Sequence, residues 1–222
     1  MKLIAWLLDL IYPPKCAFCG KLLKKDETDL CGKCRKELPE VKGSIKRGEN
    51  YRQCWPVYYY EGDVAESVRR FKFAGMQQYA RVYGRLIAMT LLRNRIEFDV
   101  LTWVPISRKR RKERGYEQTY LIAKTVAAEL GCDCVSTLKK VRDNPPQSLQ
   151  KTAANRRGNV LNAYQAVRPE RFSGKRVLLI DDIVTTGATL SECSKTLRMA
   201  GAEQVECATL AAAQNSDNSD KK

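Results

Sequence analysis

The stretch VLLIDDIVTTGATL, residues 177–190, decides the fold. An apolar strand over residues 176–180 leads into two adjacent carboxylates and a Thr-Thr-Gly turn. Apolar residues at helical spacing then predict a helix ended by Gly201, namely Leu190, Cys193, Leu197 and Ala200. Residues 204–210, QVECATL, predict a returning strand. Strand, helix and strand at this spacing predict a parallel crossover, and so an α/β sheet covered by helices on both faces.

Upstream segments alternate in the same way and extend the α/β pattern. Short apolar runs predict strands over residues 56–60, 99–104 and 134–138. Helical spacing connects three further sets: Val64, Val68 and Phe71; Tyr79, Val82, Leu86 and Met89; and Tyr116, Tyr120, Ala123, Ala127 and Leu130, with Gly131 as the stop. We therefore expect one α/β domain over residues 51–213, preceded by a small module over 1–50 and followed by a disordered polar tail over 214–222.

The loop after the predicted strand has the features of a phosphate and sugar site. Ligands of open α/β sheets bind beyond the carboxyl ends of the strands. Backbone amides and hydroxyls gather there at a helix N-terminus, from Thr185, Thr186, Gly187, Ala188 and Thr189. Asp181 and Asp182 can accept hydrogen bonds from vicinal sugar hydroxyls, but both can serve one ribose only if the chain has begun to turn. The alternative is a Thr-capped helix with two exposed acids; the P-loop and dinucleotide motifs are absent.

Two C-x-x-C pairs predict a metal site near the N-terminus, formed by Cys16, Cys19, Cys31 and Cys34. Four thiolates suit a structural zinc ion, which would supply the folding free energy that this core-poor segment lacks. A redox C-x-x-C and an iron–sulfur cluster are the alternatives. Cys54 has no C-x-x-C partner. We expect the other four cysteines to be small buried hydrophobes: Cys132, Cys134, Cys193 and Cys207.

Charge and composition narrow the class of function. Lys and Arg number 40 against 25 Asp and Glu, so the formal charge is +15 and favours an anionic partner. No histidine is present, which excludes Ser-His-Asp, Cys-His and His-metal chemistry. The apolar stretch 3–12 is too short to span a bilayer and predicts an amphipathic docking helix. Without a secretory signal, the thiols indicate a reducing compartment, the cytoplasm.

A dense run of cations, PISRKRRKERGYEQ over residues 105–118, follows the strand predicted at 99–104. We interpret it as a loop at the same sheet edge that contacts pyrophosphate or nucleic acid, through Arg108, Arg110, Arg111, Arg114 and Gly115. Tyr116 could stack on a base. The alternative is a solvated charge run.

Residues 181–190, DDIVTTGATL, resemble the phosphoribosyl pyrophosphate signature of type I phosphoribosyltransferases. The resemblance implies that Asp181 and Asp182 hold the ribose hydroxyls, that the loop 185–189 holds the 5-phosphate, and that Mg²⁺ bridges ribose and pyrophosphate. The implied fold is a type I phosphoribosyltransferase-like parallel sheet flanked by helices.

Further motifs resemble the ComF family of competence-associated proteins: PPKCAFCG, RKERGYEQ, DD-x-x-TTG-x-T, and the segment 142–164 through Gln147, Arg156, Asn159 and Tyr164. Three departures are Glu117, where the family usually has Asn, the segment of Gln147, which is slightly out of register, and a single four-cysteine set. The resemblance implies binding of phosphoribosyl pyrophosphate with Mg²⁺ and a part in DNA uptake during natural transformation. It also implies handling of incoming single-stranded DNA in the cytoplasm, with a competence helicase as a candidate partner.

Two other functions stay open at this point. One is an active phosphoribosyltransferase of nucleotide or related metabolism, whose acceptor and catalytic residues the sequence does not identify. The other is a ligand-regulated adaptor that neither catalyses nor binds DNA. Pyrophosphate release distinguishes an enzyme from the other two, and salt-dependent binding of single strands distinguishes a DNA-handling protein from an adaptor.

Overall fold

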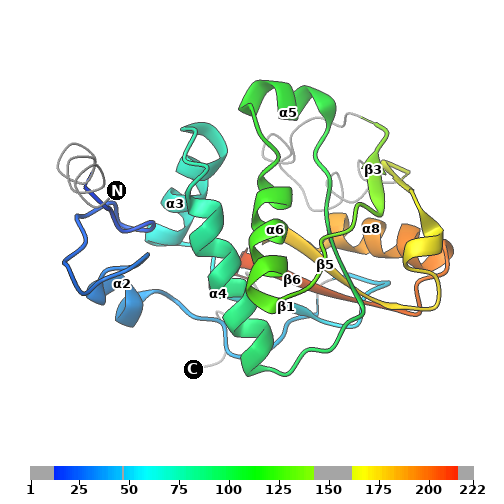
Figure 1. Cartoon of the computed structure of the whole chain (residues 1–222), viewed down its shortest axis with the longest axis horizontal. Coiled ribbons are helices and arrows are strands. Elements are labelled where there is room, and N and C mark those ends of the chain that lie inside the picture. The colour runs from blue at the N-terminus through cyan, green and yellow to red at the C-terminus, as the bar shows by residue number, and fades with distance from the viewer. Residues whose placement is uncertain (1–12, 47, 143–161, 215–222) are drawn as a thin grey trace.

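The computed structural model describes residues 13–46, 48–142 and 162–214 (Figure 1). In chain order the elements are α2 (Gly32–Glu37), β1 (Cys54–Tyr59), α3 (Gly62–Phe73), α4 (Tyr79–Arg93), β2 (Val100–Trp103), α5 (Arg108–Arg114), α6 (Gln118–Leu130), β3 (Leu138–Lys140), β4 (Tyr164–Ala166), the 3-10 turn η2 (Pro169–Arg171), β5 (Arg176–Val184), α8 (Ala188–Met199) and β6 (Gln204–Ala212). The expected helix over 3–12, the tail beyond Gln214, and Gln147, Arg156 and Asn159 lie outside the described residues.

The main sheet has the order β1-β6-β5-β2, and each neighbouring pair is parallel. Helices α4 and α6 pack on one face of this sheet and α8 packs on the other. A separate antiparallel pair, β3 and β4, lies beyond α8. The predicted crossover from β5 through α8 to β6 and the α/β class are confirmed.

Strand β5 is central in the sheet and buried on both faces, which explains its unbroken apolar sequence. Val177 and Leu179 belong to one buried cluster together with the Leu190 side of α8. Leu178 and Ile180 belong to the other cluster, shared with α4 and α6. Residues that alternate along one strand therefore connect two cores.

The buried face of α4 agrees only in part with the predicted one. Tyr79 and Val82 are buried as predicted, but Met89 is 56% exposed, and the helix also buries Tyr83, Ile87 and Leu91. The crossing of α4 and α6 fixes this rotation, because a Cβ atom at Gly84 would lie 2.4 Å from Thr125 Cβ. Only glycine permits so close an approach of two helices.

The strand predicted over residues 134–138 is shorter and later than expected. Cys134 makes only an isolated bridge with Leu101, and the regular strand β3 begins at Leu138.

The N-terminal module joins the main core through Phe18, which is fully buried. Its ring lies 5.4 Å from that of Tyr58 on β1, edge to face, and 5.9 Å from that of Tyr83 on α4. The Ser67 hydroxyl of α3 donates to the carbonyl of Ala17 at 2.5 Å. Contacts with the main domain therefore help to hold the module in place. The boundary near residue 50 stays a prediction.

Among helices in the described ranges, none combines the length and apolar character needed to cross a membrane.

Candidate functional site

The loop after β5 forms the N-terminus of α8, as the sequence predicts. Strand β5 runs to Val184, beyond the predicted end at Ile180. Gly187 then adopts a left-handed backbone with φ of 76° and caps the helix, a conformation that disfavours residues with a side chain. Asp181 and residues 183–190 line a small hollow of about 20 Å³ at this point. The structure thus brings Asp181 together with all five predicted loop residues.

Asp181 and Asp182 lie on opposite faces of the sheet, because regular strand geometry continues through both. Asp182 faces α3, where its two carboxylate oxygens accept from Lys72 Nζ at 2.9 and 2.8 Å. Asp181 faces α8 and β4, and its charge acts on Tyr164 and Cys193 there. The turn that both would need to serve one ribose is not present in this conformation.

Asp181 is a strongly perturbed acid. Burial raises the pKa of this carboxyl to about 8, and the adjacent charge of Asp182 adds to the shift. The backbone amide of Asp182 donates to Asp181 Oδ1 at 2.8 Å, and the charges of Lys72 and Lys140 also act to lower this pKa. A buried carboxyl with a raised pKa beside a phosphate-type loop is typical of functional sites.

Lys72 is a site residue that the sequence reasoning missed. It lies 110 residues before Asp182 in the chain, and only the packing of α3 brings the two together. The available signal was its position in FKF, a lysine between two aromatic residues at the end of a helix.

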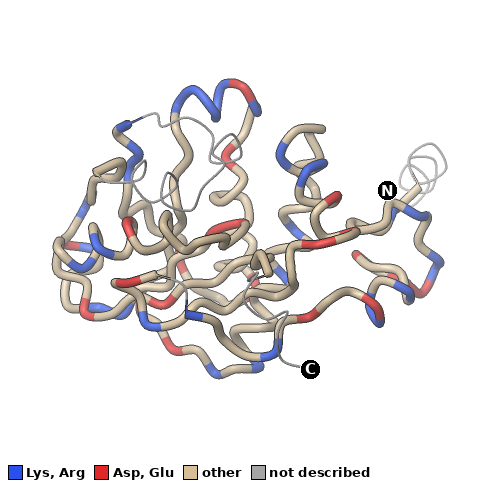
Figure 2. Tube along the Cα trace, turned by 180° about the vertical axis from the view of Figure 1, so that it is seen from behind, with Lys and Arg blue, Asp and Glu red and all other residues tan. Residues whose placement is uncertain are grey.

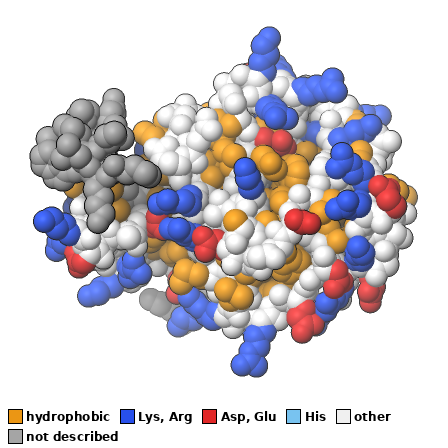
Figure 3. All heavy atoms as spheres, in the orientation of Figure 1, with side chains coloured by type: hydrophobic (Ala, Val, Ile, Leu, Met, Phe, Trp, Pro, Cys, Tyr) orange, Lys and Arg blue, Asp and Glu red, His pale blue; other side chains and the backbone are white. Residues whose placement is uncertain are grey.

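The basic segment is a helix, not the predicted loop. Ser107 caps α5 by accepting from the amide of Arg110 at 3.3 Å, and Gly115 ends it in a left-handed conformation. Arginine and lysine favour helix, so the two caps suffice for this short element. None of the α5 residues, all of them described, is buried. Figure 2 shows Lys and Arg along α5 at one edge of the molecule, and Figure 3 shows basic side chains projecting there.

Two predicted cations of α5 act on the acids of β5 or their neighbours. Burial raises the pKa of Tyr164, the charge of Asp181 adds to this shift, and the charge of Arg110 acts against it. Arg114 is affected by the charge of Asp182, although burial is the larger influence and lowers the pKa of this guanidinium. Cations from α5 therefore face both sides of the strand end. Of the other predicted residues, Arg108 is the first residue of α5 and Gly115 is its C-cap.

Tyr116 cannot stack on a base as predicted, because it is buried, packs against the Phe71 ring at 5.8 Å, and donates its hydroxyl to the Phe71 carbonyl. Glu117, the departure from the family pattern, has a structural contact: it accepts from Trp103 Nε1 at 3.1 Å and from the Ile106 amide at 3.2 Å. This carboxylate ties the start of the α5 segment to the end of β2.

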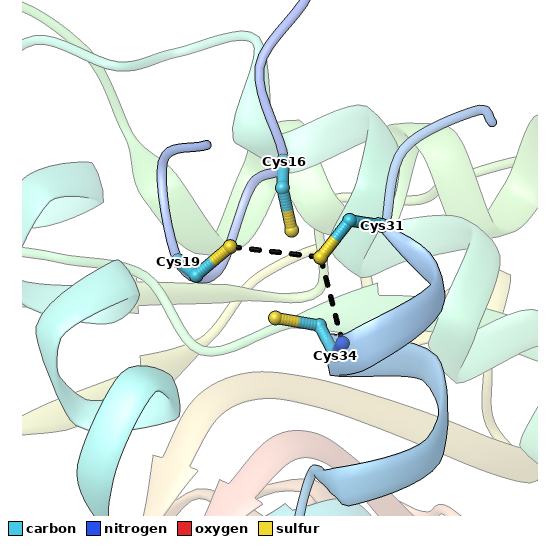
Figure 4. Close-up of side chains that lie close together, drawn as sticks. All are labelled: Cys16, Cys19, Cys31 and Cys34. Atoms are coloured by element: carbon cyan, nitrogen blue, oxygen red, sulfur yellow. Dashed lines mark hydrogen bonds between the residues drawn. The ribbon is translucent and has the colours of Figure 1, made fainter. Parts of the chain in front are cut away.

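The four predicted metal ligands converge (Figure 4). Their sulfur atoms all lie within 4.8 Å of one another, and Cys19 Sγ is 3.6 Å from Cys31 Sγ. Tetrahedral zinc with Zn–S bonds of about 2.3 Å places its sulfurs about 3.8 Å apart, so the set fits this ion. Cys31 caps α2 by accepting from the Cys34 amide at 3.5 Å, and this bond lowers the pKa of the Cys31 thiol to about 7.

The other cysteines are mostly core residues, as expected. Cys54, Cys193 and Cys207 are buried, and Cys134 is half-buried. Cys132 is exposed, so the expectation is wrong at that position, where the chain leaves α6 after Gly131.

A larger hollow, of about 490 Å³, lies at the amino ends of β5 and β6, opposite the loop. Four of its charged groups form ion pairs: Arg52 Nε lies 3.7 Å from Glu206, and Arg176 lies 2.8 Å from Glu97. Ligands of parallel sheets bind at the other, carboxyl end, so we place the candidate site there.

Comparison with known proteins agrees with this geometry. A phosphoribosyl transferase domain model matches residues 118–222, and a double zinc ribbon domain model matches residues 7–45. Competence protein F of Haemophilus influenzae is 28% identical, over 90% of this chain and 85% of its own length. DNA utilization protein YhgH of Salmonella typhimurium is 28% identical, over 88% and 90%. Competence protein ComFC of Bacillus subtilis is 25% identical, over 88% and 89%.

Among solved structures, that of the allosteric regulatory enzyme of purine biosynthesis matches with a TM-score of 0.42 and 26% identity. It covers 60% of this chain, which spans about a quarter (25%) of that protein's length.

The parallel sheet, the loop after β5 and the four-cysteine centre define a phosphoribosyltransferase-like protein with an N-terminal zinc module. The curated relatives, among them competence protein F and competence protein ComFC, support a phosphoribosyltransferase-like protein of the ComF type.

Purified protein should contain about one zinc ion per chain by elemental analysis, and the double variant Cys16→Ser, Cys19→Ser should lose it. Because Phe18 joins the module to the main core, we also expect the variant to unfold several degrees lower. Cys132→Ser, which removes a thiol far from the cluster in sequence, serves as the control and should keep the metal. Iron in place of zinc, or zinc retained by the double variant, would contradict the assignment.

The raised pKa of Asp181 predicts a pH-dependent stability. Between about pH 4 and 8 the folded state keeps a proton on Asp181 that the unfolded chain releases. The contribution of this carboxyl to the free energy of unfolding is therefore full below about pH 4 and is lost as pH rises through about 8. Asp181→Asn has no such loss. Its free energy of unfolding should exceed that of the wild type by roughly 1–3 kcal/mol at pH 8 and by much less at pH 5, measured by urea denaturation.

Asp99→Asn is a matched control with the opposite sign. Hydrogen bonds from Arg176 lower the pKa of Asp99 to about 2, so that contribution is present above about pH 4 and is lost in acid. This variant should be less stable than the wild type at neutral pH. An Asp181→Asn difference that is flat between pH 5 and 8 would mean that Asp181 is not held protonated by the fold.

Proposed function

We propose that this protein binds phosphoribosyl pyrophosphate with Mg²⁺ at the carboxyl end of β5 and acts in DNA uptake, handling incoming single-stranded DNA. The observation that carries the proposal is the shared hollow of Asp181 and the loop 185–189 at the start of α8. Backbone amides and the dipole at a helix N-terminus favour a phosphate there, and the carboxyl beside it suits a sugar hydroxyl.

Magnesium fits the chemistry of the strand end. It binds through one or two carboxylates together with substrate phosphates, and Asp181 supplies one such carboxylate next to the loop. When bound, the ion would neutralise charge on the pyrophosphate. Asp182 can join only if Lys72 leaves it, which a phosphate group competing for the ammonium would favour.

The cations of α5 support both the anionic sugar phosphate and DNA as ligands. Arg110 and Arg114 face the two sides of the strand end, whereas Arg108 and Arg111 extend the positive surface outward along an exposed helix. Neutralising several phosphates by such side chains is the main source of affinity for nucleic acids. The names of the curated relatives, which refer to competence and DNA utilization, agree with this use. The place of action would be the cytoplasm, with a helicase as a candidate partner.

Titration of phosphoribosyl pyrophosphate by calorimetry in the presence of Mg²⁺ tests the sugar-phosphate site. Asp181→Asn and Asp182→Asn should each weaken binding by at least about tenfold, because an amide cannot supply the carboxylate that Mg²⁺ would bind and that Mg²⁺ binding would favour over the protonated form at Asp181. Asp133→Asn, an exposed acid outside the site, should bind like the wild type. Unchanged affinity in both site variants would overturn the assignment. Pyrophosphate release assayed alongside would show whether the protein also catalyses transfer to an acceptor.

The basic helix predicts a salt-dependent affinity for single-stranded DNA. Arg110→Gln with Arg111→Gln should weaken binding and reduce the slope of log affinity against log salt by about 0.7 for each DNA phosphate that the variant no longer neutralises. Arg171→Gln with Lys175→Gln removes the same charge near the amino end of β5 and should leave the slope unchanged. Equal slopes for the wild type and the α5 variant would mean that these arginines do not contact DNA and instead contact pyrophosphate or solvent.

A further inference from the structure

Phe73, the last residue of α3, is 74% exposed although its ring is large and apolar. The residue before it is Lys72, which binds Asp182, so the exposed ring lies beside the candidate sugar-phosphate site. Single exposed apolar side chains are common, so the surroundings of this ring decide whether it has a function.

A guanidinium is fixed on the Phe73 ring. The Cζ atom of Arg114 lies 5.2 Å from the ring centroid, within the range of a cation–π contact. Arg114 is positioned by Gln118, whose Oε1 accepts from it at 3.0 Å. Gln118 is itself fully buried, and its Nε2 has no hydrogen-bond partner among the described residues. Arg114 therefore covers part of the ring from a defined position, while most of the ring surface stays open.

The surroundings of Phe73 are cationic. Lys72 precedes it on α3, and α5 contributes its own arginines at the same edge of the molecule (Figure 2). Arg69 and Arg70 lie one turn earlier on α3, where Arg69 pairs with Glu66 at 2.6 Å and Arg70 donates to the Phe18 carbonyl. A single exposed ring among cations differs from the contiguous apolar patch that binds another protein. It matches the surfaces that bind single-stranded nucleic acid, in which bases stack on aromatic rings and cations hold the backbone.

We propose that Phe73, backed by Arg114, is a stacking platform for an unpaired base of single-stranded DNA. The inference rests on the proposed function and adds to it a base-binding position beside the sugar-phosphate site. The base lies on the open part of the ring, and its phosphates face the cations of α3 and α5. DNA and the sugar phosphate are thereby bound as neighbours on one edge of the protein.

Fluorescence anisotropy with a labelled oligothymidylate, measured at several salt concentrations, tests the platform. Phe73→Ala should weaken binding about tenfold while leaving the salt slope unchanged, because stacking neutralises no phosphate. Phe73→Tyr and Phe73→Trp should retain the affinity. Met199→Ala, at a position that is 80% exposed at the end of α8, is the matched control and should have no effect.

An oligonucleotide carrying abasic sites identifies the stacked group directly. The wild type should bind it more weakly than the intact strand, and Phe73→Ala should bind the two alike, since no ring remains to stack on. Equal discrimination by both proteins, or full affinity of Phe73→Ala for the intact strand, would overturn the platform alone. If the wild type bound no oligonucleotide, the DNA-handling function itself would fail, and titration of phosphoribosyl pyrophosphate on the same samples would report separately on the sugar-phosphate site.

Discussion

The arrangement of the whole molecule depends on β5, a strand buried on both faces that ends in two acids. Packing on both faces fixes the strand. Asp181 and Asp182 at its end point to opposite faces of the sheet, so the cost of burying each carboxyl must be met separately on its own face. Lys72 on α3 balances Asp182, whereas Asp181 has a pKa near 8 and is held largely protonated below that pH. The helices that cover the sheet therefore also determine the electrostatics of the site.

Local sequence patterns predicted the parts of this arrangement that local forces determine. The alternation around residues 176–210 identified the crossover, because an apolar strand, a capped helix and a returning strand follow one another directly. The cysteine spacing identified the metal site for a similar reason, since each C-x-x-C pair can bind one ion by itself. The cluster within 4.8 Å then required only that one connecting loop bring the pairs together.

The features that sequence reasoning missed are those that packing over long chain separations determines. The partnership of Lys72 with Asp182 has no local signal, and the buried face of α4 is fixed by a close crossing at Gly84 that periodicity does not reveal. Tyr116 follows a run of cations and was expected to be accessible to a base, but its ring packs against Phe71 and its hydroxyl donates to the Phe71 carbonyl. The exposed aromatic residue of this edge is Phe73, which lies outside the predicted apolar stripe of α3 and which no sequence pattern marked as a binding residue.

The N-terminal module is connected to the candidate site by two routes. Through Phe18 it packs on α4, which covers the sheet face that Asp182 points toward. Near the C-terminal end of the module, the Glu49 backbone exchanges two hydrogen bonds with the Ser191 hydroxyl in the first turn of α8, at 2.9 and 2.7 Å. A Cβ atom at Gly48 would also lie 3.2 Å from the Gly187 carbonyl, so this segment rests directly on the loop that caps the helix. The four-cysteine module therefore contacts both the helix that packs over the Asp182 face of the sheet and the loop 185–189 at the start of α8, so a shift of that loop would disturb these contacts.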